Sequence, residues 1–215
     1  DLQQLELLRG PQGTLYGKSS PAGAITIRTT NPNLESIDGF IRQSFTDRDG
    51  SNTQVAASLP LIKNKLGLRV SGLYDNNENS GVTNVTLDED SQTETKAYRI
   101  VLLWEPSSNF DARLSWHSIE DDADADIVVE GQGIDFDDRI ALGDFDGAYE
   151  NKAEFLIFES NYTFTNDWVA TVSYSYQDAS IDRFFDGDAT EVQGREQFVP
   201  SPTENSIYEF RLASQ

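Results

Sequence analysis

The sequence has no cysteine, no methionine and only one histidine among its 215 residues. Without cysteine it has neither a disulfide framework nor thiolate chemistry. No run of 18 apolar residues occurs, which excludes a transmembrane helix but leaves open membrane strands, whose apolar and polar residues alternate. Basic residues are also scarce, since 16 lysines and arginines stand against 37 acids, a net charge of −21. Such a chain lacks the basic footprint that nucleic acid requires, so a nucleic-acid partner is excluded.

Alternation of apolar and polar residues is the strongest pattern after about residue 36. In "LGLRVSGLY", for example, leucine, valine and tyrosine share one face, whereas Arg69 and Ser71 lie on the other. This period of two predicts β-strands with one apolar face. Eight such strands are expected, at 37–46, 52–61, 66–74, 96–105, 110–118, 153–164, 168–177 and 206–214.

Short and long links alternate between these strands. The short links are "IKNK", "EPSSN" and "TND", whereas the long ones cover roughly 75–95, 119–151 and 178–205. Antiparallel strands joined in this order place every long loop at one edge of the sheet. That arrangement is typical of an outer-membrane barrel with tight periplasmic turns and long extracellular loops. A soluble sandwich has no reason to separate its loops by length.

The negative charge lies in the long links. Residues 75–95 carry a net charge of −6, residues 120–150 carry −11 and residues 178–205 carry −5. The rest of the chain is therefore close to neutral. This distribution fits strands that meet lipid, where charge is costly, and loops that meet external water. Trp104 and Trp168 beside short turns also suit the aromatic girdles of membrane barrels, although aromatic residues are common in any strand.

The stretch "GTLYGKSS" (13–20) resembles a phosphate-binding loop but fails as one. The loop needs four residues between its glycines and a helix directly after it. Here three residues separate Gly13 from Gly17, and a strand-like run follows "PAG". A nucleotide-binding enzyme that depends on Lys18 is thus disfavoured.

A longer pattern fills the first 30 residues. A strand-like run ends in "LLRGP" (7–11), and "LYG" (15–17), "PAG" (21–23) and "GAITIRT" (23–29) follow in order. This order resembles the end of the plug domain of TonB-dependent outer-membrane receptors. The run "EFRLAS" (209–214) also resembles an early barrel strand of that family.

The resemblance implies a fold class. It is all-β: a partial transmembrane antiparallel β-barrel of about eight strands, open as a fragment, with the end of a plug domain. Residues 1–33 then form the C-terminal part of the plug, and residues 34–215 form the N-terminal part of the barrel. Because such barrels have about 22 strands, about 14 strands are expected beyond this sequence, as are the TonB box and the first part of the plug.

The resemblance also implies a function in the cell outer membrane of a Gram-negative bacterium. Such receptors take up a scarce nutrient with energy from the TonB complex. A ferric siderophore is the expected cargo, and cobalamin, heme or oligosaccharide are the alternatives. The TonB complex, the extracellular ligand and outer-membrane lipid are the expected partners. Neither an enzymatic activity nor a cofactor is expected.

Site roles follow from the resemblance too. Arg9 is expected to lock plug to barrel by binding glutamates on the inner wall, because a guanidinium grips a carboxylate through two parallel hydrogen bonds. The alternative is a solvated arginine at a strand end. Gly10, Gly13, Gly17 and Gly23 are expected to permit tight turns where the plug packs on the wall.

Acidic runs in the second long link are weak calcium candidates. Carboxylate oxygens suit Ca²⁺, but neither "EDDADAD" nor "DFDG" has the EF-hand spacing, so a hydrated surface loop is favoured. A glycosidase pair is disfavoured, since these acids have no apolar pocket nearby. His117 falls on the polar face of its strand and is expected to be a wall residue. The candidate calcium ligands are Asp121, Asp122, Asp124, Asp126, Asp144 and Asp146.

Two further classes remain as alternatives. A passive porin-like barrel is opposed by the plug pattern. A soluble secreted β-domain that binds calcium or sugar would bury its apolar strand faces against a second sheet, whereas a barrel turns them outward to lipid.

Overall fold

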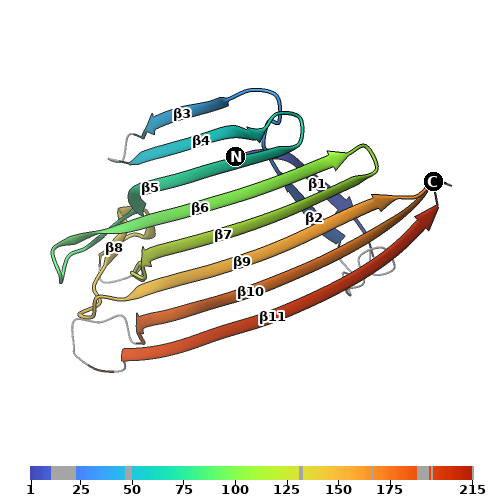
Figure 1. Ribbon diagram of the computed structural model, residues 1–215. Coiled ribbons are helices and arrows are strands. Elements are labelled where there is room, and N and C mark those ends of the chain that lie inside the picture. Colours follow the sequence, from blue (N-terminus) through green and yellow to red (C-terminus); the bar gives the residue numbers. More distant parts are fainter. Residues whose placement is uncertain are drawn as a thin grey trace.

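The computed structural model of the chain contains two β-sheets (Figure 1). The smaller one, here called the N-terminal sheet, pairs β1 (Leu2–Arg9) with β2 (Gly23–Thr29) in antiparallel fashion. The strand predicted after "PAG" is thus confirmed, and it replaces the helix that a phosphate-binding loop would need. The structure describes residues 1–10, 23–46, 50–130, 133–165, 167–187, 194 and 196–214.

The larger sheet is a single curved layer. Eight of its strands within the described residues follow the order β11-β10-β9-β7-β6-β5-β4-β3, each antiparallel to its neighbour, and the short β8 pairs with β5 beside this path. The sheet is open, with β3 and β11 at its edges. The predicted fold class is therefore confirmed. The strands are β3 (Asp38–Phe45), β4 (Ser51–Ile62), β5 (Leu66–Asn84), β6 (Glu89–Ser107), β7 (Phe110–Asp124), β8 (Ile140–Ala141), β9 (Ala148–Thr163), β10 (Trp168–Asp186) and β11 (Glu196–Ser214).

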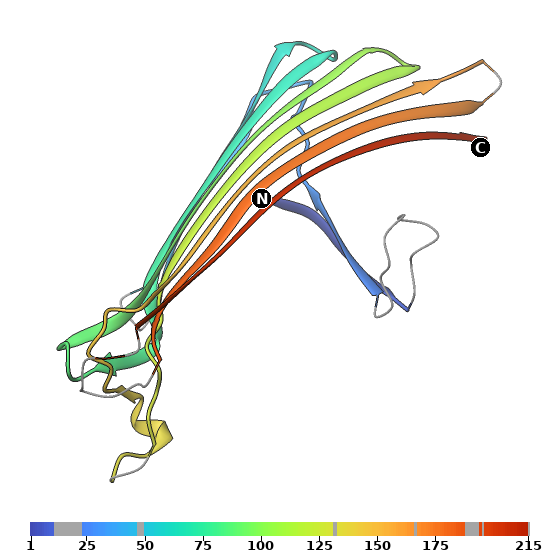
Figure 2. The same ribbon diagram turned by 90° about the horizontal axis from the view of Figure 1, so that it is seen from below.

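The N-terminal sheet lies on the concave side of the larger sheet (Figure 2). Its contacts with β5, β6 and β7 come from the first residue of the chain and from the end of β2. The concave face of the large sheet is therefore an inner wall, and the convex face is an outer wall.

The register assigns opposite chemistry to the two walls, because alternate residues of paired strands share a face. One outer row crosses five strands and is apolar or aromatic throughout, and one inner row is mostly small or polar. Since no second sheet covers the outer row in the described part of the chain, its apolar side chains stay exposed, as a lipid-facing wall requires. The outer row consists of Val70, Ile100, Trp116, Leu156 and Tyr176, and the inner row of Ser58, Arg69, Val101, Ser115 and Ile157.

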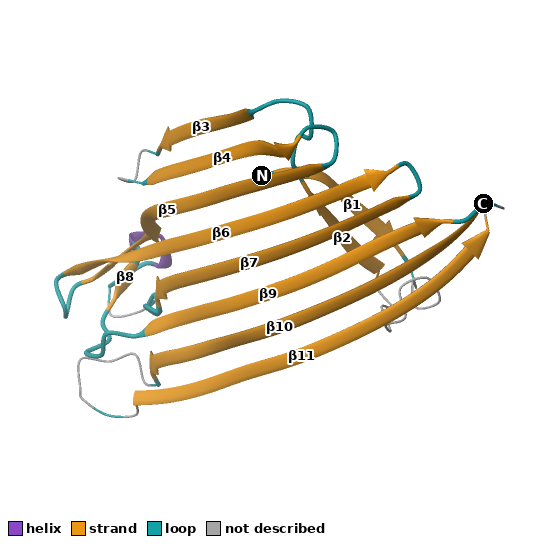
Figure 3. Cartoon of the chain, viewed as in Figure 1, coloured by secondary structure: helices purple, strands orange, loops and turns teal. Residues whose placement is uncertain are grey.

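The short links gather at one end of the large sheet, opposite the longer loops (Figure 3). β4 turns into β5 within residues 63–65, and Asn64 adopts φ 59° there. The link from β9 to β10 ends at Asp167, which adopts φ 64°. Asn and Asp tolerate this left-handed region better than most residues, so both turns are locally encoded.

Two of the predicted long links are wrong in extent. β5 and β6 stay paired as far as Asn84 and Glu89, which leaves only residues 85–88 as the turn between them. β10 likewise stays paired with β11 as far as Asp186 and Glu196. The reason is physical: where both faces of a hairpin meet water, the apolar alternation ends although the backbone ladder continues.

The third predicted link is also shorter than expected, because β7 reaches Asp124 and β9 begins at Ala148. Between them lies the 3-10 helix η1 (Phe136–Asp138), which the sequence did not reveal. Asp135 caps η1 by accepting from the Asp137 amide. No helix in the described residues is long and apolar enough to cross a membrane.

A row of charges marks the upper limit of the apolar outer wall. Lys96, Glu120 and Lys152 lie directly opposite one another on β6, β7 and β9, and Tyr74 of β5 faces Lys96. The segment 66–74 has a length that suits a spanning strand of about 9–11 residues. The rest of β5 extends beyond this row of charges.

A pair of substitutions on β10 tests the assignment of the two walls. In the full-length protein, Val172→Arg on the outer wall is expected to lower the free energy of unfolding in lipid vesicles by about 2–4 kcal/mol. Ser173→Arg is the matched control on the inner wall, where Glu159 and Glu209 lie opposite it. Urea titration of both variants measures the difference, and equal losses would contradict the assignment.

Candidate functional site

Three arginines project from neighbouring strands of the inner wall toward the N-terminal sheet. They are Arg69 of β5, Arg99 of β6 and Arg113 of β7, and together they are called the arginine stripe here. The register places all three arginines on one face of the sheet. Arg69 and Arg113 each pair with a β6 residue that lies an even number of positions from Arg99. Three cations on adjacent strands of a buried surface require anionic or hydrogen-bonding partners, which the facing N-terminal sheet can supply.

Asp1 is the anion that the stripe binds. The Arg69 guanidinium donates from Nε to Asp1 Oδ2 at 2.8 Å and from Nη2 to Oδ1 at 2.9 Å. Arg99 adds a hydrogen bond to the Asp1 carboxylate and one to its backbone carbonyl at 3.0 Å. The side chains of Arg69 and Asp1 are only 6% and 9% exposed. This is therefore a buried, two-pronged ion pair between the N-terminal sheet and the inner wall.

The segment between β2 and β3 reinforces this contact. Arg69 Nη1 donates to Ser58 Oγ at 2.7 Å and lies 3.2 Å from Asp38 Oδ1. Asn33 Nδ2 in turn donates to Asp38 Oδ2 at 2.7 Å. Asn64 N, in the β4–β5 turn, donates to the Leu34 carbonyl at 2.8 Å. The chain is thus fixed to the wall on both sides of its passage from the small sheet to the large one.

Arg113 makes a contact of a different kind. Its guanidinium donates to Thr29 Oγ1 at 3.0 Å, to Asn31 Oδ1 at 3.1 Å and to Ser115 Oγ at 3.3 Å. All three acceptors are neutral. Among the described residues no carboxylate lies within 4.0 Å of this arginine, whereas Arg69 and Arg99 each have one.

A cavity of about 410 Å³ separates the N-terminal sheet from the inner wall beside this cluster. Arg99, Gln54 and Ser71 line its wall side, and Asp1 and Thr29 line the other. His117, directly opposite Arg99 in the register, also lines it, so the predicted placement of this histidine on the inner face agrees with the structure. Its Nε2 atom is buried and has no hydrogen-bond partner among the described residues.

The plug residues singled out in the sequence lie elsewhere. Arg9 is the last residue of β1, exposed and paired in register with Gly23. Gly10 and Gly23 have φ values of 82° and 124°, a region that favours glycine, and a Cβ on Gly23 would lie 2.3 Å from the Leu8 carbonyl oxygen. Gly13, Gly17 and Lys18 lie outside the described residues.

Sequence reasoning missed the stripe and its partner Asp1. Arg69 and Arg113 were visible as basic residues on the polar faces of their strands. The pairing with Asp1 could not be seen, because 68 residues separate it from Arg69.

The six calcium candidates do not gather into one site. Asp121 accepts from Thr95 Oγ1 at 2.6 Å, and Asp124 accepts from the Gln92 amide at 2.6 Å. Among the described residues, no group of three or more acidic or histidine side chains could hold a metal ion.

Asp126 instead joins two external segments. It accepts from Asn84 Nδ2 at 2.8 Å and from Ser91, both on the β5–β6 hairpin. Asn84 Nδ2 also donates to the Gly143 carbonyl at 3.1 Å. Since Asn84 is 1% exposed, the loop between β7 and β9 is packed against the hairpin as a folded unit.

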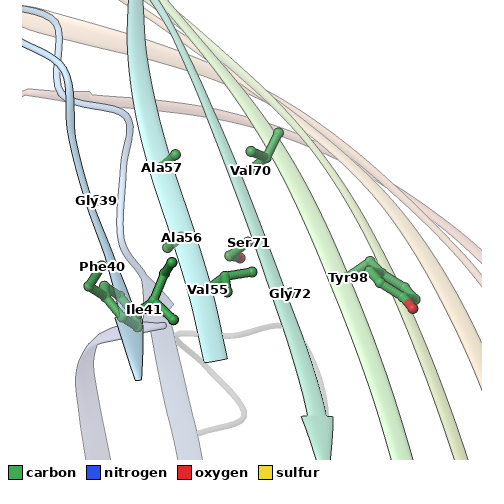
Figure 4. Close-up of a pocket in the computed structure, with 10 residues that line it drawn as sticks. All are labelled: Gly39, Phe40, Ile41, Val55, Ala56, Ala57, Val70, Ser71, Gly72 and Tyr98. Atoms are coloured by element: carbon green, nitrogen blue, oxygen red, sulfur yellow. The ribbon is translucent and has the colours of Figure 1, made fainter. Parts of the chain in front are cut away.

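The outer wall has a hollow of its own, shown in Figure 4. It has a volume of about 680 Å³ and lies where Gly72 leaves a gap between Val55 and Tyr98. Ile41 and Val70 complete its apolar lining. The hollow lies beside the inner cavity, with which it shares Phe40, Val55, Ser71, Gly72 and Tyr98 as lining residues.

The chain is similar in sequence to several receptor proteins. No protein-family model matches the chain. The chain is 23% identical over 196 residues to the ferrioxamine receptor of Yersinia enterocolitica, an alignment that covers 86% of this chain and 26% of that protein. It is 32% identical over 82 residues to the probable TonB-dependent siderophore receptor PirA of Acinetobacter baumannii. That alignment covers 36% of this chain and 11% of that protein. These relatives are transport receptors.

The crystal structure of the ferric yersiniabactin uptake receptor FyuA from Yersinia pestis superimposes with a TM-score of 0.84 at 24% identity. The match covers all of this chain and 33% of that one. The chain is thus similar to TonB-dependent siderophore receptors in sequence and in fold. The expected resemblance is thereby confirmed, as is the outer membrane of a Gram-negative bacterium as the location. This receptor chain spans about a quarter of the ferrioxamine receptor that it matches.

Replacement of one arginine of the stripe tests the contact between the N-terminal sheet and the inner wall. Arg69→Ala in the intact receptor leaves the Asp1 carboxylate buried with only one cation, which is expected to cost about 3–5 kcal/mol of local stability. Amide hydrogen exchange of β1 and β2 should therefore speed up markedly. Lys152→Ala, which removes an exposed pair with Glu150 at 3.4 Å, is the control and should cost less than about 1 kcal/mol. Unchanged exchange in the Arg69 variant would contradict the contact.

Proposed function

We propose that the intact receptor imports a ferric siderophore across the outer membrane with energy delivered by the TonB complex. One observation supports this above all: the N-terminal sheet sits inside the curve of the wall and is tied to it by a buried ion pair. Such a contact keeps a passage shut without covalent bonds, and a pull on the sheet opens it.

Contacts near the same place support the predicted domain boundary. We infer that residues 1–33 are plug and residues 34–215 are barrel wall, since Thr29 and Asn31 contact the wall whereas Asp38 begins its first strand. Arg9 remains a proposed plug lock, and its partners would be glutamates on wall strands beyond this sequence. In the described part of the chain, the charges that hold the sheet are reversed: the acid is on the plug and the arginines are on the wall.

The energetics suit a plug that must move. Breaking a buried pair by removing one partner typically costs about 3–5 kcal/mol, so thermal motion opens the contact only rarely. Arg113 adds neutral hydrogen bonds, each of them weaker than a charged pair. A mechanical pull breaks these contacts in sequence, and the same contacts draw the sheet back afterwards.

The outer wall supplies the lipid contacts. We propose that acyl chains of the outer membrane fill the hollow beside Gly72, because its lining is apolar and continues the lipid-facing band. The activity is transport and not catalysis. Binding and release of the cargo need no covalent step, and Arg69 and Arg99 of the inner wall are engaged in holding the N-terminal sheet.

A siderophore is favoured over other cargo because similar receptors take ferrioxamine, yersiniabactin and pyoverdine as ligands. Cobalamin, heme and oligosaccharide are the alternative cargoes that the experiment below distinguishes.

Uptake by cells tests this function. Cells whose sole receptor for the test ligands is the intact protein are expected to accumulate ⁵⁵Fe from at least one ferric siderophore, and to lose that uptake when TonB is deleted. Radiolabelled cobalamin, heme and a maltooligosaccharide serve as comparison ligands. If only one of these comparison ligands is taken up, that ligand and not a siderophore is the cargo. Uptake that persists without TonB would contradict transport driven by TonB.

A further inference from the structure

The inner wall already binds a carboxylate in the described state. Arg69 and Arg99 together hold the Asp1 carboxylate through three N–H donors, in a setting where all three side chains are at most 10% exposed. The wall contributes the cations and the movable N-terminal sheet contributes the anion. If the sheet moves away, both arginines lose this partner while they remain on the rigid wall.

Two more groups beside this pair have unused capacity. Arg113 donates hydrogen bonds only to neutral oxygens among the described residues, and Glu159, its register partner on β9, interacts with it without a hydrogen bond within the described residues. A buried guanidinium binds anions more strongly than neutral acceptors. His117 Nε2 is buried without a hydrogen-bond partner in the described residues, which is unusual for a buried polar atom. Both lie on the inner face of β7, and His117 is the register partner of Arg99.

Arg99, His117 and Asp1 border a space large enough for part of a ligand, whereas Arg69 and Arg113 are not among its lining residues. The cavity of about 410 Å³ is lined by Arg99, His117, Gln54 and Ser71 on the wall side and by Thr29 on the side of the N-terminal sheet, so it offers hydrogen-bonding side chains from both sides. Leu2, Ile27 and Ile119 supply apolar surface around them. Apolar walls with a few convergent polar groups are the usual composition of a small-molecule site.

We propose that the arginine stripe with His117 is a transit site for an anionic cargo, and that Asp1 occupies the place which a cargo carboxylate takes when the N-terminal sheet withdraws. The cargo class is an iron chelate with at least one free carboxylate. This inference rests on the proposed transport function. Exchange of one carboxylate for another keeps the buried guanidiniums neutralised, so the plug moves without exposing bare charge.

The test measures uptake by the intact receptor of ⁵⁵Fe chelates that carry a free carboxylate, each beside its methyl-amide counterpart. Binding at the cell surface and uptake are measured separately. Arg99→Gln and His117→Gln are expected to lower uptake of the carboxylate chelate about tenfold, since each removes a hydrogen bond to a charged group. Surface binding should change less than about twofold, and uptake of the amide in Arg99→Gln should match that in Asp1→Asn, which breaks the same contact.

Asp1→Asn is the matched comparison for Arg99→Gln. Both variants break the same ion pair, but only the arginine variant removes the anion-binding group. Asp1→Asn is therefore expected to keep the preference for the carboxylate chelate. Arg211→Gln, an exposed arginine on β11, is the control for the loss of a positive charge. If Arg99→Gln fails to fold, Arg99→Lys is measured in its place. Arg99→Lys should retain part of the preference for the carboxylate chelate.

The outcomes separate the transit site from the function on which it rests. If the wild-type receptor takes up no ferric chelate, the transport function fails, and the transit site fails with it. If wild type takes up the chelates but Arg99→Gln and His117→Gln reduce carboxylate and amide equally, the transit site alone is wrong. A loss confined to the carboxylate chelate supports it.

Discussion

The buried pair between Asp1 and Arg69 is the interaction on which the rest of the arrangement depends. Two parallel hydrogen bonds at 2.8 and 2.9 Å join a segment at the start of the chain to the third strand of the wall. Without that pair, the apolar strand faces would still form a curved sheet. The N-terminal sheet would have no fixed position inside the curve, because two strands bury too little surface to hold themselves there.

The pair also explains the distribution of polarity in the wall. An arginine at the centre of a soluble β-sandwich would have no partner, and on a lipid-facing surface it would cost several kcal/mol. It is tolerated on β5 because the concave face is an interior that another part of the chain fills. The outer face of the same strand, at Val70 and Gly72, keeps the apolar character that lipid requires. One strand therefore satisfies two environments through simple alternation.

The sequence predicted most of this fold, and its failures have a clear pattern. Alternation located eight strands because one wall is apolar and the other polar over the membrane-spanning length. It missed the upper parts of β5, β6, β10 and β11, where both faces are hydrated and residues such as Asp75 and Glu204 interrupt the period although the ladder continues. η1 was missed because a three-residue helix leaves almost no periodic signal.

The site was less predictable than the fold. The glycine and arginine pattern of the first 30 residues indicated a plug, but it drew attention to Arg9 and away from Asp1. Nothing local marks Asp1, because its importance comes from partners 68 and 98 residues away. From the sequence, the stripe could be suspected only from arginines on the polar faces of strands. That the cations lie on the wall and the anion on the N-terminal sheet becomes clear only when the two sheets are seen together.

The central claim is that the N-terminal sheet must leave the wall during transport, and a reversible tether tests it most directly. Thr29 and Ser115 both accept from Arg113, one on each side of the contact. With both changed to cysteine in an intact receptor that has no other cysteine, a short bis-methanethiosulfonate links the sheet to the wall. The account predicts that the linked receptor binds its ferric ligand but takes up none, and that reductant restores uptake. Uptake at the wild-type rate with the link in place would contradict it.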